Sequence, residues 1–168
     1  MAKYSRQKLK LFYLRDFLLR SSDEEHRLTI RDMIANLASH DISAERKSLY
    51  SALNLLQEYG MDIVRTPKGY YVGSRGFELP ELKLLVDSVQ SSKFITHKKT
   101  ATLIHKLESL ASVHEAKQLN RQVFVMNRIK SMNESIYYNV DAISEAISAR
   151  VKIEFRYFEY GPDKQRRF

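Results

Sequence analysis

Apolar residues recur every three or four positions along most of the first sixty residues, which is the spacing of helices that bury one face. This spacing predicts helices over 6–19, 30–39 and 44–59. Thr29 is placed to cap the second of these helices and Ser43 to cap the third, which Gly60 would end. The second and third helices are separated only by the short HDI sequence at 40–42. Two helices joined by such a turn are typical of a helix-turn-helix.

After Gly60 the apolar pattern changes from a helical to an alternating period. The sequence MDIVRTPKGYYVG at 61–73 places two short apolar runs on either side of a Pro-Lys-Gly turn, which is typical of a β-hairpin. We expect Tyr70 and Val72 to close the core, and Arg65 and Lys68 to lie at the hairpin tip. A hairpin directly behind a helix-turn-helix would form the wing of a winged helix.

The third predicted helix has two opposite faces. At about 100° per residue, its leucines lie on one side, and these are Leu49, Leu53 and Leu56. The other side carries Lys47, Tyr50, Ser51 and Asn54. The segment between Arg46 and Gln57 contains no acidic residue, whereas helix faces that are merely solvated usually carry Glu/Lys pairs. The leucines are expected to dock the helix and turn the polar face outward.

A helix-turn-helix inserts its second helix into the major groove of DNA, where side chains meet base edges. Asn can pair with adenine, Ser can donate or accept, and Lys can reach guanine or a phosphate. We therefore expect base contacts from Lys47, Tyr50, Ser51 and Asn54. Phosphate contacts are expected from Arg46, Arg65 and Lys68, and further backbone contacts from Thr29 and Arg31. The alternative is that this face is only solvated.

The rest of the chain continues with helical spacing and ends with a strand pattern. Helices are predicted over 79–91, 97–111, 113–122 and 136–147, with Thr96 as the cap of the second, and strands over 123–126 and 151–157. A lone strand leaves its backbone groups unpaired, so the last one is expected to need a partner from 123–126 or from a second copy of the chain. We divide the chain into a winged helix-turn-helix at 1–76, a helical connector at 77–135 and a final part at 136–168.

Composition narrows the class of protein. The 168 residues contain no cysteine, and the longest apolar runs are only four residues, at 11–14 and 123–126. We therefore expect a soluble cytoplasmic protein with no disulfides, no membrane span and no secretory signal. The net charge is +8, shared about equally by the parts before and after Gly76. This excess permits a polyanionic partner, although a generally basic soluble protein would carry it too.

The sequence offers no catalytic or metal-binding pattern. The five histidines form neither an HxxxH pair nor an HExxH motif, and no cysteine is present to complete a zinc site. The five glycines match neither a Walker A loop nor a dinucleotide fingerprint, and each stands where a turn is expected. We expect no enzyme activity, no catalytic residues, no bound metal and no cofactor.

The segment HRLTIRDMIANLASHDISAERKSLYSALNLLQEYGMDIV resembles the N-terminal winged helix of bacterial WYL-domain transcriptional regulators. The resemblance continues through FELPELKLLVDSVQSSKFITHKKTATLIHKLESL, KSMNESIYYNVDAISEAI and KIEFRYFEY, and so covers essentially the whole chain. It implies a mainly α fold with a small β-hairpin, in which a winged helix and a helical connector precede a WYL domain. That domain is a small Sm-like or SH3-like barrel that senses a ligand.

The chain departs from this family pattern at its end. VKIEFRYFEY would be the first strand of the WYL barrel, but the residues that give the domain its name are absent, so we expect a truncated barrel. The leading hypothesis is a sequence-specific regulator that binds double-stranded DNA, with a possible homodimer interface in 79–112. The runner-up is a winged helix that binds another protein. A third hypothesis is a regulator whose ligand sensor is missing, with an unknown effector.

Overall fold

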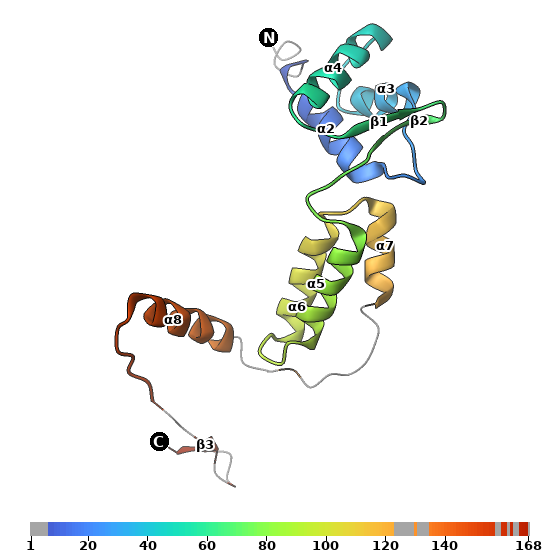
Figure 1. The fold of residues 1–168 in the computed structure, drawn as a ribbon. Helices are drawn as coiled ribbons and strands as arrows, with labels where there is room; N and C mark the ends of the chain where they lie inside the picture. Colours follow the sequence, from blue (N-terminus) through green and yellow to red (C-terminus); the bar gives the residue numbers. More distant parts are fainter. Residues whose placement is uncertain are drawn as a thin grey trace.

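The structure is a computed structural model that describes residues 7–122, 130, 135–156, 159, 160, 162 and 165–167. Its described part is mainly helical and includes a two-stranded antiparallel hairpin near the N-terminus. Figure 1 shows the N-terminal helices and this hairpin grouped at one end of the molecule, followed by a second group of helices. The two groups have separate apolar cores.

We call the first group the N-terminal unit. It consists of α2 (Lys10–Ser21), α3 (Ile30–Ser39), α4 (Arg46–Glu58), β1 (Ile63–Thr66) and β2 (Gly69–Val72). Its core draws apolar side chains from all five elements, including the fully buried Leu14, Leu18, Met33, Leu37 and Leu49. The predicted positions of α3 and of the hairpin are confirmed. In the region of the first predicted helix, residues 7 and 8 are helical, and α2 runs two residues beyond the predicted end.

The two caps predicted for these helices have different outcomes. Thr29 caps α3, because its hydroxyl accepts from the Asp32 amide while the Asp32 carboxylate accepts from the Thr29 amide. The prediction that Ser43 caps α4 is wrong: α4 begins at Arg46, and its N-cap Glu45 makes no side-chain capping bond. Ser43 accepts hydrogen bonds from Gln7 instead, at its carbonyl (3.1 Å) and at its hydroxyl (3.3 Å).

The hairpin is joined by hydrogen bonds to the loop that precedes α3. Its register pairs Ile63 with Val72, and the loop before α3 joins it through two hydrogen bonds between Leu28 and Tyr70, both 2.8 Å long. Tyr70 and Val72 are buried, which confirms their predicted role in the core. The hairpin, which follows α4 in the chain, therefore lies against the loop that leads into α3.

We call the second group the helical unit, which consists of α5 (Leu79–Ser91), α6 (His97–Glu108) and α7 (Val113–Gln122). The predicted bounds of α5 and α7 are confirmed, and Thr96 caps α6 by accepting from the Lys99 amide. The core of this unit is small and contains Leu82, Val86, Ile104, Ala111 and Leu119.

The final part of the chain differs from the expectation. The helix α8 (Ser135–Ala149) forms as predicted, but residues 151–156 are exposed and are not a strand. The described strands there are β3 (Glu159–Tyr160) and β4 (Arg166–Arg167), which pair antiparallel. The predicted strand at 123–126 and the end of the other at Tyr157 lie outside the described residues. In the part of the chain that the structure describes, no helix is both long and apolar enough to cross a bilayer.

Candidate nucleic-acid interface

The two faces of α4 lie as the sequence predicts. Leu49, Leu53 and Leu56 are buried in the N-terminal unit, with at most 5% of each side chain exposed. The opposite face carries Lys47, Tyr50, Ser51 and Asn54, and all four are exposed, Tyr50 at 39%. At the start of α4, the Lys10 ammonium of α2 donates to the Ser48 hydroxyl at 2.5 Å. The leucines and this contact hold the helix with its polar face outward.

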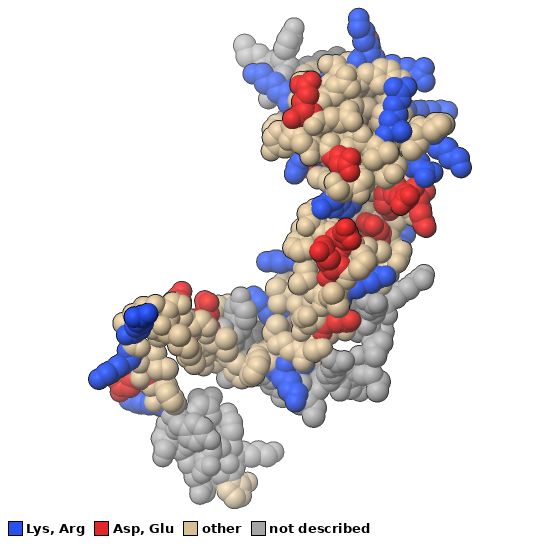
Figure 2. All heavy atoms as spheres, viewed as in Figure 1, with Lys and Arg blue, Asp and Glu red and all other residues tan. Residues whose placement is uncertain are grey.

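An open groove of about 620 Å³ lies between the start of α3, the start of α4 and the hairpin. Four cationic side chains line it, and these are Arg31, Arg46, Arg65 and Lys68. We call these four residues the groove cations. No acidic residue is among the groove's lining residues, and the ion pairs in the described part of the chain use none of the four. Figure 2 shows several Lys and Arg side chains projecting from the N-terminal unit.

Tyr50 and Tyr70 supply the aromatic surface of this groove. The Arg65 guanidinium lies 6.0 Å from the centre of the Tyr70 ring, at the outer limit of a cation–π contact. Tyr70 is buried in the hairpin, so the ring offers a fixed surface to the flexible arginine. The groove thus combines four cations, with no carboxylate among its lining residues, with the aromatic rings of Tyr50 and Tyr70.

A smaller hollow of about 310 Å³ lies beside the groove, between α4 and the hairpin. Tyr50, Arg65 and Tyr70 line both spaces, and Asn54 and Gln57 line only the smaller one. The Gln57 side-chain amide donates to the Ile63 carbonyl at 2.9 Å. Gln57 was not among the predicted site residues. Its helical spacing from Asn54 was a usable signal, but its partner on β1 could not be read from the pattern.

The structure therefore brings most of the predicted site residues together. The groove is lined by Thr29, Arg31, Arg46, Tyr50, Arg65 and Lys68, and Asn54 lines the adjoining hollow. Lys47 and Ser51 line neither space and lie on the exposed face of α4. The cations thus flank the start of α4, and its outward polar side chains continue along the helix.

Thr29 acts as a cap rather than as a free donor. Its hydroxyl and its backbone amide both donate to the Asp32 carboxylate, at 2.7 and 2.8 Å. These hydrogen bonds hold the pKa of Asp32 below its ordinary value. Since both donors of Thr29 are occupied, the positive charge of Arg31 is the feature of this helix end that can meet an anion.

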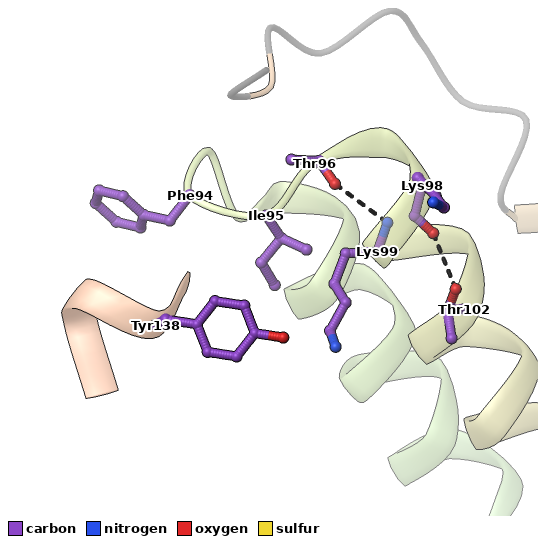
Figure 3. A pocket seen from close by; sticks show the side chains of 7 residues that line it. All are labelled: Phe94, Ile95, Thr96, Lys98, Lys99, Thr102 and Tyr138. Atoms are coloured by element: carbon purple, nitrogen blue, oxygen red, sulfur yellow. Dashed lines mark hydrogen bonds between the residues drawn. The ribbon is translucent and has the colours of Figure 1, made fainter. Parts of the chain in front are cut away.

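A separate small pocket of about 180 Å³ lies between the start of α6 and Tyr138 of α8 (Figure 3). Its lining combines apolar side chains with the lysines at the start of α6. The Thr96 hydroxyl there is engaged with the Lys99 amide, and the Thr102 hydroxyl donates to the Lys98 carbonyl. Among the described residues, no group of three or more His, Asp or Glu side chains could hold a metal ion.

Comparisons with known proteins do not assign this chain to a family. No protein-family model matches the chain, and searches of curated proteins and of solved structures found no match.

Proposed function

We propose that this protein is a sequence-specific DNA-binding transcriptional regulator, and that residues 7–76 are a winged helix-turn-helix. In this reading α3 and α4 are the two helices of the motif, and β1 and β2 form its wing. The helix α4 enters the major groove with its outward face toward the base edges. The resemblance to WYL-domain regulators points to the same function.

The observation that carries the proposal is the groove formed by Arg31, Arg46, Arg65 and Lys68. Four cations from three separate elements surround one open space whose lining contains no carboxylate. Like charges gathered in this way repel one another, and a polyanion removes the repulsion while releasing its own counterions. A DNA phosphate backbone that follows the groove would place the neighbouring face of α4 against the bases.

The exposed residues of α4 suit base recognition. Asn54 and Ser51 lie one turn apart or less on the same face, and both have side chains that donate and accept hydrogen bonds. Tyr50 lies at the border between this face and the groove, because it lines both the groove and the smaller hollow beside it. We assign base contacts to Lys47, Tyr50, Ser51 and Asn54, and phosphate contacts to the groove cations.

The resemblance implies a ligand-sensing barrel after residue 136, whereas the described residues there form α8 and two paired strands of two residues each. We therefore propose no effector-binding residue on this chain. A homodimer through 79–112 remains a prediction of the sequence analysis.

The salt dependence of binding tests this proposal. Fluorescence anisotropy with a labelled duplex should show binding whose logarithmic affinity falls linearly with the logarithm of salt concentration. Four phosphate contacts predict a slope of roughly −3 to −4. Absence of binding at low salt would contradict the proposal. Retention of a partner protein by the same α4 face, with no DNA binding, would favour a protein-interaction module instead.

A further inference from the structure

The N-terminal unit and the helical unit meet through buried polar side chains, beside an open pocket that apolar side chains of both units, such as Leu19 and Leu110, also line. Their apolar cores are separate, and the core residues of one unit are not shared with the other. Two of the few buried polar side chains face each other at the junction: Asp23, in the loop after α2, and Ser112, just before α7, are 8% and 0% exposed. The orientation of one unit on the other therefore depends on what these side chains contact.

Among the described residues, three side-chain pairs join the start of α7 to the N-terminal unit. The Ser112 hydroxyl donates to the Asp23 carboxylate at 2.6 Å. The rings of His26 and His114 stack in parallel, with centroids 3.6 Å apart and planes 2° apart. The Arg75 guanidinium lies 3.9 Å from the Glu115 carboxylate. We call these three pairs the α7 lock.

Asp23 is also held by hydrogen bonds within the N-terminal unit. The Asp23 carboxylate also accepts from the His26 amide at 2.9 Å, and the His26 Nδ1 lies 2.7 Å from it. Burial acts to raise the pKa of Asp23, but the hydrogen bonds from Ser112 and His26 outweigh burial and lower it. Asp23 is therefore a carboxylate held in its charged form, and losing its partners would leave a buried charge unpaired.

Arg75 connects the α7 lock to the N-terminal unit. Its guanidinium donates to the main-chain carbonyls of Leu19 and Ser22, at 2.6 and 2.5 Å, and only 10% of the side chain is exposed. The Ser22 hydroxyl in turn accepts from the amide of Val72 in β2 at 3.1 Å. The junction is thus continuous with the strand that carries one side of the groove.

The α7 side of the lock is confined to one turn of helix. Its three partners are Ser112, His114 and Glu115. Ser112 and Glu115 also cap α7, because the Ser112 amide donates to the Glu115 carboxylate and the Glu115 amide donates to the Ser112 hydroxyl, each at 3.1 Å. A small displacement of this turn would therefore strain all three contacts at once, because they share one rigid helical start.

We propose that the first turn of α7 locks the N-terminal unit in one orientation on the helical unit, so that movement of α7 is transmitted to α4 and the hairpin as a rigid rotation. That consequence for DNA rests on the proposed function, but the lock itself does not. In a protein with two DNA-reading units, such a lock would fix the separation and angle of the two α4 helices. A release of the lock would weaken binding to a two-site duplex more than binding to a single site.

Distance measurement by double electron–electron resonance tests the lock without DNA. The chain has no cysteine, so Ala38→Cys on α3 and Ala101→Cys on α6, both at exposed positions, place one spin label on each unit. The test variant Ser112→Ala/His114→Ala/Glu115→Gln removes the α7 side of all three contacts. The matched control Thr96→Ala/His97→Ala removes the cap of α6 and the histidine beside it, which make no contact across the junction.

We expect one narrow distance distribution for the parent and for the control, and a broad or shifted distribution for the test variant. A narrow, unchanged distribution in the test variant would overturn the proposal, as would a broad distribution in the parent. If the test variant loses helix content by circular dichroism, Asp23→Ala/His26→Ala replaces it, since these changes remove two of the three pairs from the side of the N-terminal unit and leave the cap of α7 intact. Because no DNA is present, a failure here is distinct from a failure of the proposed function.

Discussion

The side-chain amide of Gln57 donates a hydrogen bond to the main-chain carbonyl of Ile63 at 2.9 Å. This contact joins the last turns of α4 to the first residue of the hairpin. It matters for the proposed function because the groove cations are divided between these elements, with Arg46 on α4 and Arg65 and Lys68 on the hairpin. We therefore expect Gln57 to help fix the position of the hairpin relative to α4.

Replacing Gln57 by Ala should loosen the hairpin. We expect the free energy of unfolding to fall by about 1 kcal/mol, the usual net contribution of one hydrogen bond. DNA affinity should fall as well, because the groove cations lose their fixed spacing. Chemical denaturation and anisotropy measure the two effects. The exposed neighbour Glu58, changed to Ala, serves as the control for stability, and an equal loss in both variants would refute the role given to Gln57.

Gly69 and Gly60 provide a matched pair for testing how the hairpin is held. Both have a positive φ, +135° and +105°, which L side chains rarely adopt. A Cβ on Gly69 would lie 2.6 Å from the Leu28 carbonyl oxygen, whereas a Cβ on Gly60 would meet nothing within 4 Å. Gly69→Ala should therefore destabilise the protein clearly more than Gly60→Ala, since it also disrupts the Leu28–Tyr70 pairing. Thermal unfolding compares them, and equal shifts would show that steric contact is unimportant.

The capping box of α3 predicts a pH dependence. The pKa of Asp32 is lowered in the folded protein by hydrogen bonds from Thr29, so its contribution to stability is present above the unfolded pKa of about 4. That contribution is lost as the pH falls through the lower, folded value. The difference in unfolding free energy between the parent and Asp32→Asn should therefore shrink on acidification. Asp87→Asn on α5 is the control, and a difference that stays constant from pH 7 to 3 would contradict the prediction.

Local sequence signals predicted much of the fold. The Thr29 cap, the Pro-Lys-Gly turn and the bounds of α5 and α7 depend on residues close in the chain, and all are confirmed. The cap predicted at Ser43 is wrong because α4 begins only at Arg46, and the partner of Ser43 is Gln7, 36 positions away in the chain. The alternating pattern at 151–156 suggested a strand, but alternation does not supply the partner that a strand needs.

The candidate site was only partly predictable. The outward face of α4 follows from periodicity, so Tyr50 and Asn54 could be identified from the sequence. The groove could not, because it forms where Arg31, Arg46 and Arg65 converge from distant elements. The α7 lock was missed for the same reason, because Asp23 and Ser112 are 89 residues apart in the sequence.

The central claim is that the face of α4 reads bases while the groove cations hold phosphates. The direct test is to measure the affinities of each variant, at one salt concentration, for a duplex selected from a random library and for its scrambled counterpart. Asn54→Ala and Ser51→Ala should lower the ratio of the two affinities, by roughly 5- to 150-fold for a residue that makes a good base contact. Arg65→Ala and Lys68→Ala should lower both affinities alike and leave the ratio unchanged, and Lys106→Ala, which removes an equal charge from α6, should alter neither. Equal losses on both duplexes from all four changes in the N-terminal unit would contradict the account.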